Sequence, residues 1–72
     1  MITKNEVKVL TEFGFVFFAE GLGTAWFISP EHPTVVLRRD ARDEWFVLHK
    51  DDEEPPAYWL SFGECIRTLQ RL

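Results

Sequence analysis

Four short segments in the middle of the chain constrain the fold most, because large apolar residues occupy both sets of alternating positions in each of them. After Gly14 the apolar period changes from 3.6 to 2, and the residues become aromatic and β-branched, which is typical of β-strands. A strand with one face in water normally alternates apolar and polar residues, so both faces of this sheet need a cover. The expected strands are Phe15–Glu20, Thr24–Ser29, Thr34–Arg39 and Glu44–Lys50.

The connections between these segments predict an antiparallel meander. Gly21 to Gly23 form a three-residue loop, in which either glycine could adopt the positive φ that a hairpin of that length requires. Pro30 and Pro33 cannot donate ladder hydrogen bonds and favour a second reversal. The polar stretch Asp40–Asp43 favours a third, so strands that follow one another in sequence should pair in space.

A helix is expected on each side of the strands. Thr3 and Glu6 form a capping box, and the first helix should span about Lys4–Phe13 before Gly14 ends it. Ser61 and Glu64 form a second box that opens a helix to Leu72, and the preceding Tyr58–Leu60 could add a short edge pairing. The apolar stripes of the two helices contain Ile2, Val9, Leu10 and Phe13, and Phe62, Cys65, Ile66, Leu69 and Leu72.

The expected fold is therefore of the α+β class, a four-stranded antiparallel meander sheet flanked by N- and C-terminal helices in the order α-β-β-β-β-α. A chain of 72 residues cannot build two separate cores, so we expect a single domain over residues 1–72. Two short helices cover about one face of such a sheet. The other face could be covered by curvature of the sheet, by a second copy of the chain, by a different protein, or by the segment Pro55–Leu60.

Charge and cysteine content narrow the partners and the compartment. Twelve acidic and eight basic side chains give a net charge of −4, which disfavours attraction to nucleic acid or an anionic membrane and favours a basic partner. The acidic excess lies in residues 40–64. The single Cys65 excludes an internal disulfide, and the N-terminus lacks the features of a signal peptide. We expect a cytoplasmic protein that does not contact a membrane.

Candidate chemical sites are weak. Cys65 follows the Ser61 cap, where helix amides lower a thiol pKa, but it shares an apolar stripe that favours a core position. His32 and His49 belong to no recognisable nucleophile motif. Together with Asp51–Glu54 they offer metal donors, but the spacings of zinc and calcium motifs are missing. We expect no enzyme activity, no metal and no cofactor.

Direct binding of nucleic acid is also not expected. Phe18, Trp26 and Trp45 could stack on bases, but the interleaved lysines and arginines that track phosphates are missing. The order of elements resembles that of double-stranded-RNA-binding domains. The second helix of those domains begins with a lysine-rich phosphate clamp, and the corresponding helix here begins after Ser61 with Phe62, Gly63 and Glu64.

Protein binding is the function class that remains. The leading hypothesis is a non-enzymatic inhibitor or sequestering protein that acts on a basic, nucleic-acid-handling protein. In size and charge the chain resembles phage or mobile-element inhibitors such as anti-CRISPR proteins and nucleic-acid mimics. The alternative is a homo-oligomeric structural or accessory protein, for example a homodimer, that buries its second sheet face against its own copy. The expected partner-binding residues of the leading hypothesis are Asp40, Asp43, Glu44, Trp45, Asp51, Asp52, Glu53, Glu54, Tyr58 and Trp59.

Overall fold

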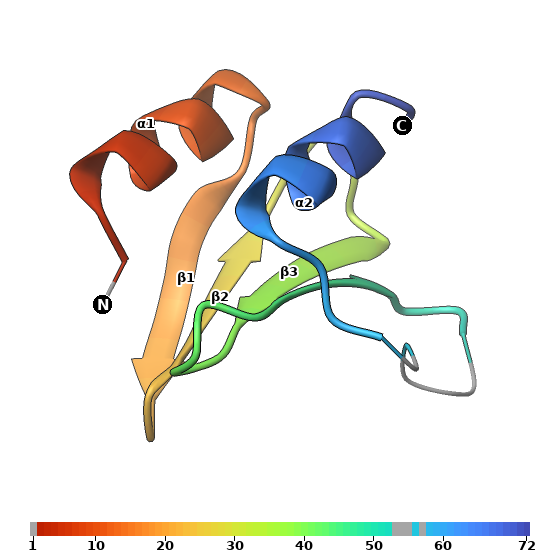
Figure 1. Cartoon of the computed structure of the whole chain (residues 1–72). Coiled ribbons are helices and arrows are strands. Elements are labelled where there is room, and N and C mark those ends of the chain that lie inside the picture. The colour runs from red at the N-terminus through yellow and green to blue at the C-terminus, as the bar shows by residue number, and fades with distance from the viewer. Residues whose placement is uncertain (1, 53–55, 57) are drawn as a thin grey trace.

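The computed structural model describes residues 2–52, 56 and 58–72 and confirms the α-β-β-β-β-α order (Figure 1). The four strands form one antiparallel sheet in the order β1-β2-β3-β4. Each expected strand is present, and its ends lie within one residue of the expected ones. The elements are α1 (Lys4–Glu12), β1 (Val16–Gly21), β2 (Thr24–Ile28), β3 (Val35–Arg39), β4 (Trp45–His49) and α2 (Phe62–Leu69).

Both helices begin at the expected capping boxes. The Thr3 hydroxyl accepts a hydrogen bond from the Glu6 N–H at 3.1 Å, and the Glu6 carboxylate accepts one from the Thr3 N–H at 2.9 Å. Ser61 and Glu64 make the same reciprocal pair, with both distances 3.2 Å. These bonds satisfy backbone N–H groups that have no partner inside the helix, which fixes where each helix starts. α2 ends at Leu69, three residues before the expected end at Leu72.

The hydrophobic core lies between the helices and one face of the sheet, which we call the inner face. Figure 1 shows α1 and α2 on the same side of the sheet. Leu10 of α1 and Cys65 and Leu69 of α2 are buried there. The buried apolar residues that the sheet and its approach contribute are Phe15, Ala25, Phe27, Val35, Leu37, Trp45 and Val47. The opposite side of the sheet, which carries no helix of the described chain, is called the outer face.

The β1–β2 turn is tighter than expected. Gly21 pairs with Thr24 at the end of the ladder, which leaves a two-residue turn of Leu22 and Gly23. Their φ angles are +52° and +80°, and two positive φ angles are the mark of the type I′ turn that matches strand twist. The expected three-residue loop was therefore wrong, because a leucine adopts a conformation that usually selects glycine or asparagine.

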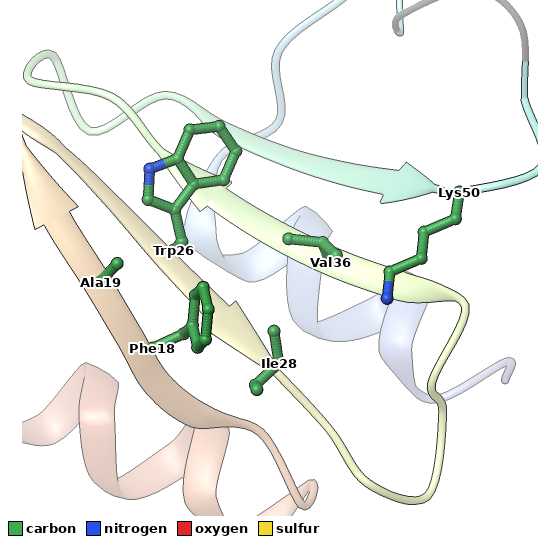
Figure 2. Close-up of a pocket in the computed structure, with 6 residues that line it drawn as sticks. All are labelled: Phe18, Ala19, Trp26, Ile28, Val36 and Lys50. Atoms are coloured by element: carbon green, nitrogen blue, oxygen red, sulfur yellow. The ribbon is translucent and has the colours of Figure 1, made fainter.

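A β-bulge interrupts β1. Phe17 pairs with Phe27 and Ala19 pairs with Trp26, so Phe18 is an additional residue on the β1 side of the ladder. Figure 2 shows the side chains of Phe18 and Ala19 on the same face of the sheet. Strict alternation predicts that Ala19 lies with Phe17 on the opposite face from Phe18, and this prediction is wrong because a bulge breaks the alternation of side chains.

Candidate functional site

The outer face is an apolar surface to which all four strands contribute. The alternation that buries Phe27, Leu37 and Val47 on the inner face places their neighbours in sequence on the outer face. Phe18 is 65% exposed and Val16 is 46% exposed. Exposed apolar patches of this kind mark interaction surfaces on soluble proteins. The apolar residues of the outer face are Val16, Phe18, Ala19, Trp26, Ile28, Val36, Phe46 and Leu48.

A hollow of about 420 Å³ occupies the part of the outer face nearest to Lys50. Figure 2 shows the Phe18 ring standing at the β1 side of this hollow and the Lys50 side chain at the opposite side. Lys50 is the only charged residue that lines it. The sequence indicated an apolar second face, but it could not indicate this hollow, because the bulge that brings Ala19 to the same face as Phe18 leaves no sequence signal. The lining residues are Phe18, Ala19, Trp26, Ile28, Val36 and Lys50.

Arg38 covers the other end of the outer face. Its guanidinium carbon lies 4.4 Å from the Phe46 ring centroid and 5.8 Å from that of Trp26. Its Nε lies 3.3 Å from a carboxylate oxygen of Asp40, which neutralises the charge. A paired guanidinium stacked on two rings shields their faces from water. The unshielded apolar area is therefore concentrated around the hollow.

The acidic residues expected to bind a partner do not form one surface. Asp40 pairs with Arg38 and Asp43 pairs with the buried Arg39, so the β3–β4 loop is largely neutralised from within. Asp51 and Asp52 are exposed, but they follow the opposite end of β4. The strand separates them from Glu44 by about 17 Å, at about 3.3 Å per residue. Of the remaining acidic residues in the expected site, Glu53 and Glu54 lie outside the described residues.

The aromatic residues expected to anchor a partner also lie in two different environments, the core and the surface. Trp45 is fully buried, with its ring centroid 5.9 Å from that of Phe27 and 5.2 Å from that of Phe62. It belongs to the core, so its assignment as a surface anchor was wrong. Tyr58 and Trp59 are 82% and 55% exposed.

The segment just before α2 pairs with the sheet instead of covering the outer face. The Leu60 N–H donates to the Trp45 carbonyl at 2.8 Å, and the Trp45 N–H donates to the Leu60 carbonyl at 2.9 Å. This confirms the expected edge pairing for Leu60. Leu60 also packs against the core. Leu60 belongs to the segment that was expected to be able to cover the outer face, but it lies beside Trp45 at the edge of the sheet instead.

The candidate chemical groups are placed as structural residues. Cys65 is fully buried in α2, and burial raises the pKa of its thiol to about 12, which leaves it protonated and unreactive at neutral pH. His32 stacks on Phe15 with ring centroids 6.2 Å apart, and His49 is exposed at the end of β4. Among the residues that the structure describes, no group of three or more histidine, cysteine, aspartate or glutamate side chains could hold a metal ion.

The chain gives no significant match to any protein-family model, curated protein or solved structure. In the described part of the chain, neither helix has the length and apolar character that crossing a bilayer requires. The outer face and the exposed loop residues are therefore what suggests a function.

Proposed function

We propose that this chain is a non-enzymatic accessory protein that acts as a homodimer, in which the outer face of the sheet packs against the outer face of a second copy. The observation that carries this proposal is the apolar outer face, formed by all four strands and left without a helix by the described chain. The burial of Cys65 supports a non-enzymatic role, because this thiol is the only candidate nucleophile that the sequence offered.

Packing of two such faces follows the physics of β-sandwiches. Sheets stacked face to face lie about 10 Å apart, and the side chains of the two facing surfaces interdigitate to form a core. Four strands about 4.8 Å apart and about five residues long present a face of roughly 19 by 17 Å. Burial of apolar surface contributes about 25 cal/mol per Å², so removal of this face from water would stabilise a dimer. A two-fold dimer is the commonest assembly, and it buries the same patch on both copies.

Sedimentation velocity from low micromolar to near-millimolar concentration tests this proposal. We expect a reversible monomer–dimer equilibrium in the wild-type chain. The double variant I28T/V36T keeps the β-branched shape of both side chains while it adds hydroxyls to the outer face, and it should weaken the dimer at least about tenfold. Val7→Thr makes the same chemical change on α1 and serves as the matched control. A wild-type chain that is monomeric at every concentration, or a dimer unaffected by I28T/V36T, would contradict the proposal.

A second candidate function is the inhibitor or sequestering protein that binds a basic, nucleic-acid-handling protein. The specific observation in its favour is the exposure of Tyr58 and Trp59 in the same loop region as the exposed Asp51 and Asp52. Aromatic rings with neighbouring carboxylates suit a basic partner surface. Under this candidate, binding of a fluorescent poly-lysine peptide should fall in D51K/D52K, and its salt dependence should decrease. Equal affinity and equal salt dependence in the variant would argue against it.

A further inference from the structure

We draw no further inference here: the strongest candidate, the apolar hollow of about 420 Å³ between Phe18 and Lys50 on the outer face, carries none, because nothing in the part of the chain that the structure describes shows what covers it.

Discussion

The loss of stability on replacement of Trp45 distinguishes two roles for this residue. The structure places it in the core, whereas the sequence suggested a surface anchor. A domain of 72 residues has a free energy of unfolding of about 4–11 kcal/mol, at about 0.05–0.15 kcal/mol per residue. Removal of a buried aromatic side chain costs about 3–5 kcal/mol. Trp45→Ala should therefore remove much of the stability, whereas a surface anchor would change it by about 0.5 kcal/mol or less.

Trp45→Phe is the more informative variant. The indole Nε1 of Trp45 is buried and has no hydrogen-bond partner among the described residues, and such a donor costs about 1–3 kcal/mol. The smaller ring leaves a cavity of roughly 40 Å³, which at about 24 cal/mol per Å³ costs about 1 kcal/mol. The lost apolar contact costs about 1 kcal/mol more. These terms nearly cancel, so we expect W45F to change the free energy of unfolding by no more than about 1 kcal/mol.

Urea unfolding followed by far-UV circular dichroism gives this free energy. Phe27→Leu is the control, because it replaces a buried ring that has no polar atom with a smaller apolar side chain. This substitution should cost about 1–2 kcal/mol. Fluorescence gives a second readout: loss of Trp45 leaves the half-buried Trp26 and the more exposed Trp59, so the emission should shift to longer wavelength. A loss above about 3 kcal/mol in W45F would refute the reasoning that the indole N–H is unsatisfied.

Three further predictions concern the helix cap, the thiol and the turn. Hydrogen bonds from Ser61 lower the pKa of Glu64 below its ordinary value of 4.5. The ionised Glu64 therefore stabilises the fold above pH 4.5, and this stabilisation is lost as the pH falls through the pKa of the folded state. In a series of thermal melts at different pH values, E64Q should reduce the loss of stability at acidic pH. With its pKa raised to about 12 by burial, Cys65 should resist iodoacetamide in the folded protein and react in urea, and rapid modification without urea would contradict its burial. Leu22→Asn should raise the free energy of unfolding by about 1 kcal/mol, because asparagine tolerates the positive φ found there, and an unchanged urea midpoint would count against this strain.

Sequence patterns predicted the fold well where local chemistry determines it. The capping boxes at Thr3 and Ser61 fixed the starts of the helices, and alternation of apolar residues fixed the strands. The β1 bulge and the φ of Leu22 escaped prediction, because neither residue type prefers its observed conformation. Both conformations are set by pairing across the sheet, which overrides local preference.

The candidate site was predicted less well, because a count of charges along the chain does not show how those charges pair. Residues 40–44 contain three acidic side chains, but two of them pair with arginines of β3. Arg38 and Arg39 precede the loop and lie outside residues 40–64, the segment that carries the acidic excess. Trp45 follows the loop directly, but alternation turns it into the core. The doubly apolar strands were the stronger indication of a binding surface, because burial depends on the face of the sheet and alternation assigns each residue to a face.

The β1 bulge also favours association through the face of the sheet over association through its edges. Val16, Phe17 and Phe18 are exposed along β1, and an exposed apolar edge strand is a template for pairing with another chain. The additional residue at Phe18 interrupts the ladder in the middle of that edge and increases its twist, which opposes regular pairing. At the opposite edge of the sheet, Leu60 already occupies the backbone groups of Trp45. Lateral growth of the sheet is thus disfavoured at both edges, and the bulge that disfavours it at β1 is the same feature that places Ala19 beside Phe18 on the outer face.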